Sequence, residues 1–228
     1  MSAIVLLSGG LDSAVNLKLA VDEGRVLSAL TFDYGQRAAA REAAAAALMC
    51  RQLGVFHRLI ELPWLAEICR TALVDRSAAI PEVRAEAVET GAGAPTAEAV
   101  WVPNRNGVFV NIAAAFAEAL GADSIVAGFN SEEAATFPDN SAAFVAATNA
   151  ALSHSTLSKP ELRSYTQDMT KAEIVARGRE AGAPIATIWS CYLGGVEHCW
   201  RCESCARLER ALRQAKAWEW FHTNRTIA

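Results

Sequence analysis

The chain has 228 residues, of which 52% are hydrophobic and 20% are charged, so it can bury a full core and is not a disordered protein. Its formal net charge of −4 and its sequence pI near 5.6 exclude the strongly basic balance that is typical of general nucleic-acid binders. No apolar run reaches the length of about 18 residues that a membrane-spanning helix needs.

The first half of the chain alternates strand-like and helix-like segments. Residues 3–7 (AIVLL) are a short, continuous apolar run, which is typical of a strand buried on both faces. Residues 13–21 favour a helix, residues 25–32 a second strand, the alanine-rich residues 37–53 a second helix, and residues 55–62 a third strand. This alternation predicts an α/β fold with a parallel sheet flanked by helices.

The second half changes character along its length. Residues 82–99 lack clear periodicity and predict a mobile loop, whereas residues 108–120 predict a helix and residues 124–128 another buried strand. Beyond Asn140 the pattern is mostly helical. We therefore expect an α/β nucleotide-binding core over residues 1–140 and a helical C-terminal region over residues 141–228, together forming one compact domain.

A glycine-containing turn follows the first predicted strand and leads directly into a helix, over the segment Ser8-Gly9-Gly10-Leu11-Asp12-Ser13. Glycines let the backbone turn sharply, and the N–H groups and dipole of the following helix favour an anion. Ser8 and Ser13 can donate hydrogen bonds to phosphate, while Asp12 can either hold Mg²⁺ or cap the helix. A plain strand–turn–helix is the alternative, but the place of the turn after the first strand favours anion binding.

Four of the six cysteines lie close together, at Cys191, Cys199, Cys202 and Cys205. Four thiolates at such short spacings can complete a tetrahedral Zn²⁺ site, which would be structural because no coordination position stays open. An iron–sulfur cluster and two disulfides are the alternatives. The N-terminal segment lacks the positive charge of a signal peptide, so we expect a cytoplasmic, reducing location, which favours zinc.

The S-G-G-x-D-S segment resembles the PP-loop of the ATP pyrophosphatases, enzymes that adenylate a substrate and release pyrophosphate. The resemblance implies an adenine nucleotide alpha hydrolase-like fold, with the end of the second strand, at residues 31–34, beside the adenine or ribose. It also implies that the ATP phosphates are surrounded by one continuous segment of the chain. Its members are Leu7, Ser8, Gly9, Gly10, Leu11, Asp12, Ser13, Ala14, Val15, Asn16 and Leu17.

Further motifs narrow the resemblance to one family. They are FDYGQR at residues 32–37, VPNRN at 102–106, FPD at 137–139, TKAEI at 170–174 and WSCY at 189–192. Together with the loop, they resemble the 7-cyano-7-deazaguanine synthase family of the queuosine pathway, from Ile4 to about Leu212 but with no match over residues 62–99.

This resemblance implies a specific chemistry. ATP would activate the carboxylate of 7-carboxy-7-deazaguanine as an acyl-adenylate, ammonia would displace AMP to give an amide, and a second ATP would activate the amide for dehydration to the nitrile. Mg²⁺ and Zn²⁺ are the implied metals and a homodimer is the implied assembly, with no membrane or nucleic-acid partner.

The resemblance also assigns roles to individual residues. The catalytic group would be Asp12, Lys171 and Arg105, and the substrate-binding group Gln36, Arg37, Arg105, Phe137 and Asp139. From the residues alone, an exposed lysine or arginine at a helix start explains Lys171 and Arg37 equally well, and helix capping by the neighbouring asparagines explains the polar cluster around Arg105.

The chain departs from the family's usual pattern at two places. Ala38 stands where histidine is usual, and residues 133–140 (EAATFPDN) replace a D-x-S-G-Y-P-D-C pattern. The second segment would face the heterocycle, so two other enzymes stay open: an adenylating amide synthase with another acid, or a tRNA-modifying enzyme, which the mild acidity disfavours. A zinc-stabilised nucleotide sensor without turnover is the alternative from a different class.

Overall fold

The structure is a computed structural model, which describes residues 1–88 and 96–226. Its centre is a five-stranded, fully parallel sheet in the order β3-β2-β1-β4-β5. The strands are β1 (Ser2–Leu6), β2 (Arg25–Asp33), β3 (His57–Glu61), β4 (Ser124–Val126) and β5 (Glu161–Arg163). This confirms the predicted fold class, a parallel α/β sheet flanked by helices.

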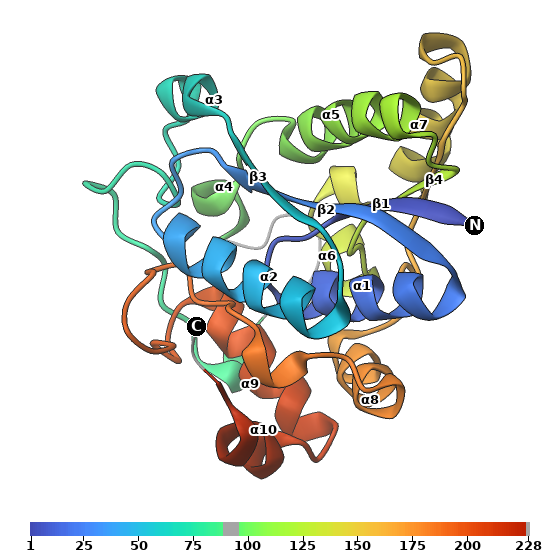
Figure 1. Cartoon of the computed structure of the whole chain (residues 1–228). Helices are drawn as coiled ribbons and strands as arrows, with labels where there is room; N and C mark the ends of the chain where they lie inside the picture. The colour runs from blue at the N-terminus through green and yellow to red at the C-terminus, as the bar shows by residue number, and fades with distance from the viewer. Residues whose placement is uncertain (89–95, 227–228) are drawn as a thin grey trace.

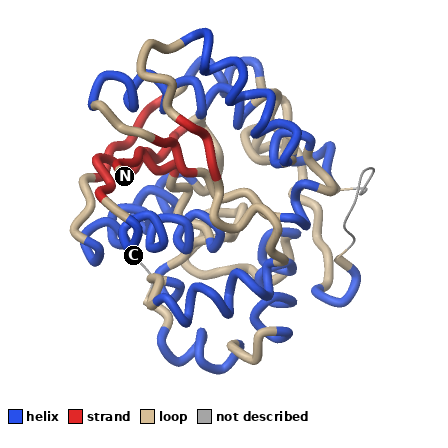
Figure 2. The backbone as a smooth tube through the Cα atoms, turned by 90° about the vertical axis from the view of Figure 1, so that its right-hand side faces the viewer, coloured by secondary structure: helices blue, strands red, loops and turns tan. Residues whose placement is uncertain are grey.

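Helices cover both faces of the sheet (Figures 1 and 2). One face packs on α1 (Leu11–Glu23) and α2 (Ala39–Leu53), and the other on α5 (Arg105–Leu120) and α7 (Ala142–Ser155). The C-terminal helices α8 (Lys171–Ala181), α9 (Glu203–Gln214) and α10 (Trp218–Asn224) lie on the α1 and α2 side of the molecule (Figure 1). The short helices are α3 (Pro63–Ile68), α4 (Ala97–Val100) and α6 (Ser131–Ala134), with 3-10 turns at Ala85–Ala87, Pro138–Asn140 and Ile185–Thr187.

The core explains why the strands are apolar throughout. Consecutive residues of β1 point to opposite faces, so Ile4 belongs to the apolar cluster under α5 while Val5 belongs to the cluster under α1. The cluster on the α1 side continues through Met49 of α2 to Leu208 of α9 and Phe221 of α10. The C-terminal helices therefore share a core with the α/β sheet.

The strands and helices predicted from the first 128 residues are present with shifts of a few residues at their ends. The strand β5 was missed, because it lies in the stretch expected to be mostly helical and has only three residues, Glu161–Arg163. It pairs with β4 and buries Leu162. Of the predicted loop at 82–99, the structure shows the turn Ala85–Ala87 and the start of α4, while residues 89–95 lie outside the described part. No helix among the described residues has the length and apolar character needed to span a membrane.

Candidate functional site

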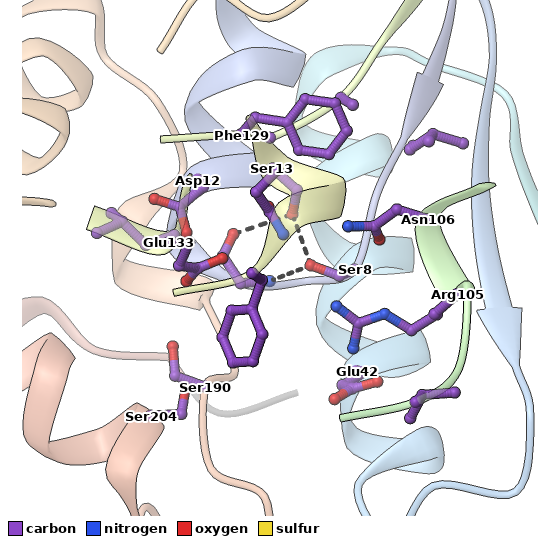
Figure 3. A pocket seen from close by; sticks show the side chains of 18 of the residues that line it. Ser8, Asp12, Ser13, Glu42, Arg105, Asn106, Phe129, Glu133, Ser190 and Ser204 are labelled. Atoms are coloured by element: carbon purple, nitrogen blue, oxygen red, sulfur yellow. Dashed lines mark hydrogen bonds between the residues drawn. The ribbon is translucent and has the colours of Figure 1, made fainter. Parts of the chain in front are cut away.

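A pocket of about 240 Å³ lies at the carboxyl ends of β1, β2 and β4. The chain leaves β1 toward β2 on one side and pairs it with β4 on the other, and ligands of open α/β sheets bind at such a switch point. The turn after β1, the end of β2, the first turns of α2, α5 and α8, and the segment leading into α9 all contribute to its wall (Figure 3).

The turn after β1 has the geometry that an anion site requires. Gly9 has a φ of +81°, and a Cβ at this position would lie 2.7 Å from the carbonyl oxygen of Glu42, so both conformation and space demand glycine. The Ser8 and Ser13 hydroxyls lie 3.1 Å apart at the pocket (Figure 3). Helix α1 begins at Leu11 without any side-chain cap, which leaves its first N–H groups available to a ligand.

Asp12 does not cap the helix, because its carboxylate turns to the opposite wall of the pocket. Lys171 Nζ lies 2.7 Å from Asp12 Oδ2 and 2.7 Å from Glu133 Oε1. The other oxygen of Asp12, Oδ1, is buried and has no hydrogen-bond partner among the described residues. These three side chains therefore form a buried charged cluster with one cation and two carboxylates.

The charges of this cluster depend on one another. Burial raises the pKa of Asp12, although the Lys171 ammonium opposes that shift. Burial also disfavours the Lys171 cation, but the two carboxylates outweigh it and raise the pKa of the ammonium. Burial would raise the pKa of Glu133 too, but Lys171 outweighs it and holds that pKa below its usual value. Lys171 is thus a fixed cation at neutral pH.

Lys171 is held in place by its own helix. It is 8% exposed and is the first residue of α8, where Thr170 and Glu173 form a reciprocal capping box. Its backbone N–H donates to Glu132 Oε1 at 2.9 Å. The alternative of a solvent-exposed lysine at a helix start is wrong, because this side chain points into the protein.

The opposite end of the pocket combines a guanidinium with aromatic and acidic groups. Arg105 opens α5, and its Nη1 lies 3.5 Å from the Tyr34 hydroxyl. Asp139 accepts hydrogen bonds from the Asn106 N–H at 3.4 Å and from Asn140 Nδ2 at 3.1 Å. Burial is the main cause that raises the pKa of Asp139 and of the Tyr34 hydroxyl.

Flat apolar surfaces complete this end. Phe137 stacks on Trp101 with ring centres 5.8 Å apart and an angle of 12°, and Phe32 stacks on Phe109 at 4.1 Å and 8°. All four rings line the pocket. Such surfaces suit a planar heterocycle.

Ten of the sequence-predicted site residues line this single pocket: Leu7, Ser8, Gly10, Leu11, Asp12, Ser13, Arg105, Phe137, Asp139 and Lys171. Gly9 does not line the pocket, but it lies in the same turn and packs against the backbone of α2. Ala14, Val15, Asn16 and Leu17 do not line the pocket, because they lie farther along α1, where the helix is buried in the core. Asn16, for example, donates a hydrogen bond to Thr166 Oγ1 at 2.7 Å.

Gln36 and Arg37 also lie outside the pocket lining. Gln36 is buried, donates to Glu42 Oε2 at 2.7 Å and accepts from the Tyr34 N–H at 2.9 Å, so it supports two residues that do line the pocket. Arg37 donates instead to the carbonyl oxygens of Asp75 and Ala78 and holds that loop.

Several pocket residues were not assigned from the sequence. Glu42, Glu133, Ser190, Ser204 and Arg207 line the pocket, but each belongs to a segment far along the chain from the PP-loop motif. Glu42 sits in an alanine-rich helix, where a carboxylate in the first turn is normally explained by the helix dipole. Only the fold brings these side chains together.

The four clustered cysteines form a second site beside the pocket. Their sulfur atoms all lie within 4.8 Å of one another, and Cys199 Sγ and Cys205 Sγ are 3.9 Å apart. Tetrahedral thiolate ligands at the Zn–S distance of about 2.3 Å place sulfur atoms about 3.8 Å apart. The sulfurs are too far apart for a disulfide, whose S–S bond is about 2.05 Å, so the cluster is compatible with a bound metal.

The two remaining cysteines are isolated in the core. Cys50 and Cys69 are both buried, and burial raises the pKa of the Cys50 thiol to about 12. A thiol that stays protonated is a poor nucleophile and metal ligand, so Cys50 acts as an inert core residue.

The chain is similar to several known proteins. The model of the family described as "Queuosine biosynthesis protein QueC" matches residues 2–216. A protein of Pelotomaculum thermopropionicum named 7-cyano-7-deazaguanine synthase is 55% identical over 216 residues, which cover 94% of this chain and 98% of that protein. A protein of Methanosarcina mazei with the same name is 46% identical over 217 residues, covering 93% and 94% of the two chains. The solved structure of NMN synthetase from Francisella tularensis has a TM-score of 0.48 and 15% identity, covering 99% of this chain and 87% of that one.

Proposed function

Because the chain belongs to the QueC family of queuosine biosynthesis proteins, we propose that it is an ATP-dependent carbon–nitrogen ligase, a 7-cyano-7-deazaguanine synthase. Its substrates would be 7-carboxy-7-deazaguanine, ammonia and ATP. The observation that carries the proposal is the pocket itself, in which an uncapped helix start and a buried lysine face an arginine set among aromatic rings.

ATP would bind with its phosphates at the turn Ser8–Ser13. The N–H groups at the start of α1 and the two serine hydroxyls can donate to phosphate oxygens. In the first step, a carboxylate oxygen of the acid attacks the α-phosphorus and pyrophosphate leaves, taking the electrons of the broken phosphorus–oxygen bond. Lys171 is the fixed cation at this turn, so it would stabilise the negative charge that develops there.

Asp12 is the residue that would hold Mg²⁺. Its buried Oδ1 has no hydrogen-bond partner within residues 1–88 and 96–226, and Mg²⁺ in such enzymes is bound by one or two carboxylates together with substrate phosphates. When bound, the ion would neutralise phosphate charge. Since Oδ2 is paired with Lys171, Asp12 would also keep that ammonium beside the phosphates.

The deazaguanine acid would lie at the aromatic end. Phe137 and Trp101 offer a stacking surface, Asp139 an acceptor for the N–H groups of the heterocycle, and Arg105 a partner for its carboxylate. Ammonia then attacks the acyl carbon and AMP leaves, giving the amide. A second activation of the amide oxygen by ATP allows its departure with AMP as the nitrile forms.

The cysteine cluster would hold one Zn²⁺ as a structural ion, since four thiolates leave no open position. The segment that carries it also lines the pocket, through Ser190, Tyr192 and Ser204. The ion would therefore keep one wall of the pocket in place.

Three further expectations belong to this proposal. A cytoplasmic location fits the separated thiols of all six cysteines. Ammonium from solution would supply the nitrogen as ammonia, after loss of a proton. A homodimer is expected, and the exposed Phe56, Trp64 and Ile68 along the β3 edge and α3 offer apolar surface for it.

The direct test is product analysis with the purified protein. With ATP, Mg²⁺, ammonium and 7-carboxy-7-deazaguanine, we expect release of pyrophosphate and a product with the mass of the nitrile. Benzoate and other planar acids serve as controls and should release none. Pyrophosphate release with another acid but not with 7-carboxy-7-deazaguanine would overturn the proposed substrate and leave only the adenylation.

A further inference from the structure

The proposed reaction needs a proton acceptor, and none has yet been assigned. Ammonium is the main form of the nitrogen donor at neutral pH, and it must lose a proton before nitrogen can attack the acyl carbon. A general base for this step must lie in the pocket and must not be neutralised by a permanent cation. The inference that follows rests on the proposed function.

Five carboxylates line the pocket in the described part of the chain: Asp12, Glu42, Glu133, Asp139 and Glu203. Three of them are paired with cations, since Asp12 and Glu133 share Lys171 and Glu203 is bonded to Arg207. Each of these three carboxylates already has a cationic hydrogen-bond partner, so taking a proton from ammonium would break an ion pair.

Asp139 is occupied in a different way. Its Oδ2 accepts from the Asn106 N–H and its Oδ1 from Asn140 Nδ2, so both oxygens already have donors. Each such bond favours the charged form, although burial still raises the pKa of this carboxyl, and neither oxygen is left free to take a proton. Asp139 is better suited to accept hydrogen bonds from a substrate than to take a proton.

Glu42 differs from the other four. It lies in the first turn of α2, and its Oε2 accepts one hydrogen bond from an uncharged group, Gln36 Nε2, at 2.7 Å. Among the described residues, no hydrogen bond to its Oε1 is formed. The groups that face it are Arg105 from α5 and Asp33 and Tyr34 from the end of β2; burial nevertheless dominates and raises the pKa of this carboxyl.

The location of Glu42 also fits. A Cβ atom added to Gly9 would lie 2.7 Å from the carbonyl oxygen of Glu42. The first turn of α2 is therefore in contact with the turn Ser8–Ser13, the proposed phosphate turn. The Glu42 carboxylate interacts electrostatically with Arg105, and Figure 3 shows both side chains at the same end of the pocket. An acyl-adenylate that spans from the phosphate turn to Arg105 must pass this carboxylate.

We propose that Glu42 is the general base of the amide-forming step. An N–H bond of ammonium breaks and its proton forms an O–H bond with Glu42. The nitrogen lone pair then forms the bond to the acyl carbon, the bond from that carbon to the adenylate oxygen breaks, and AMP leaves with the electron pair. The nitrogen still carries three hydrogens at this point, and it loses one of them as a proton to water to give the neutral amide. The proton on Glu42 passes to solvent water before the next turnover.

The test separates adenylation from nitrogen transfer in the variant Glu42→Gln, which keeps the shape of the side chain. Without ammonium, acid-dependent exchange of label between pyrophosphate and ATP reports adenylation alone, and it should stay within about threefold of the wild type because this step needs no base. With ammonium at pH 7, amide formation should fall by a factor of about 100 or more. Raising the pH should restore it in part, because free ammonia then replaces ammonium.

Two further variants serve as comparisons. Glu42→Asp should retain part of the amide-forming rate, because it keeps a carboxylate. Glu61→Gln removes an exposed carboxylate at the end of β3, outside the pocket, and should behave as the wild type in both assays.

The outcomes are distinct. Normal amide formation by Glu42→Gln at pH 7 would overturn the inference, and so would an equal loss of exchange and of amide formation, which would make Glu42 part of the ATP site. Absence of acid-dependent exchange in the wild type would overturn the proposed function itself. Selective loss of the ammonia step with recovery at high pH would support both.

Discussion

Gly9 is required in the turn Ser8–Ser13, the proposed phosphate turn, because the structure leaves no room there for a Cβ atom. The residue combines a left-handed φ of +81° with a 2.7 Å approach to the backbone of α2, whereas Gly54 has a similar φ of +67° but no atom within 4 Å of an added Cβ. A substitution at Gly54 would therefore introduce backbone strain alone, whereas a substitution at Gly9 would introduce backbone strain and a steric clash.

This pair gives a matched test of the turn. Gly54→Ala should cost about 1 kcal/mol of unfolding free energy, as expected for a left-handed alanine, and leave ATP affinity unchanged. Gly9→Ala must in addition push α2 away from the turn, so ATP should bind about 10-fold or more weakly. Calorimetric titration with ATP and urea unfolding measure the two effects. Equal ATP affinity in the two variants would remove the turn from the binding site.

Lys171 links stability to the pH of the solution. Because the lysine holds the pKa of Glu133 below its usual value, the folded protein gains stability from this group above the usual carboxyl pKa and loses it as the pH falls. Replacing the lysine leaves two buried carboxylates without a cation, at a cost of about 3–5 kcal/mol when both are charged.

The expected result for Lys171→Met is a stability deficit that depends on pH. The deficit relative to the wild type should be largest at pH 7 and should shrink toward pH 5, because the carboxylates of the variant take up protons there, while in the wild type Lys171 holds the pKa of Glu133 below its usual value. Urea unfolding at both pH values measures it. Lys18→Met, which breaks an exposed pair with Asp22 on α1, should show a small deficit at either pH. A constant deficit for Lys171→Met would argue against the buried cluster.

At the scale of elements, the segment that carries the cysteines is tied directly to the phosphate turn. The Trp189 N–H donates to the Gly9 carbonyl oxygen at 2.8 Å, just before the first cysteine of the cluster. His198 Nε2 accepts from the Ser190 N–H at 2.9 Å, and Phe221 of α10 is fully buried against this region. The C-terminal aromatic residues thus pack around the segment that carries the cysteines.

Loss of the metal should therefore weaken nucleotide binding as well as the fold. In Cys199→Ser we expect the zinc content to fall from about one per chain and ATP affinity to drop, because the segment no longer holds Gly9. Cys50→Ala removes an isolated core thiol and should keep its zinc. Metal analysis and ATP titration of both variants check this. Unchanged ATP affinity in a zinc-free protein would show that the cysteine site does not support the nucleotide site, and it would contradict this prediction.

On the scale of the whole molecule, sites formed by one short segment could be predicted from the sequence, whereas sites formed by residues from distant segments could not. The phosphate turn and the cysteine cluster could be recognised because each lies within a few residues of sequence. Glu42, Glu133 and Arg207 reach the same pocket only because the parallel sheet brings three distant segments to one edge. Their roles could not follow from local pattern.

The fold was predictable to the same extent. Long apolar runs and strong helices gave the α/β class, but β5 has three residues and no pattern of its own, and only its pairing with β4 makes it a strand. Arg37 illustrates a different limit. It was expected at the substrate because of its motif, and in the structure its side chain donates to the carbonyl oxygens of Asp75 and Ala78, a contact that the motif alone does not indicate.

The central claim, that this pocket activates the acid as an adenylate, is tested most directly by following oxygen. With 7-carboxy-7-deazaguanine labelled with ¹⁸O in its carboxylate, attack on the α-phosphorus must transfer a labelled oxygen to AMP. We predict ¹⁸O in the phosphate of AMP, released together with unlabelled pyrophosphate. Label in inorganic phosphate with formation of ADP, or AMP without label, would contradict the account.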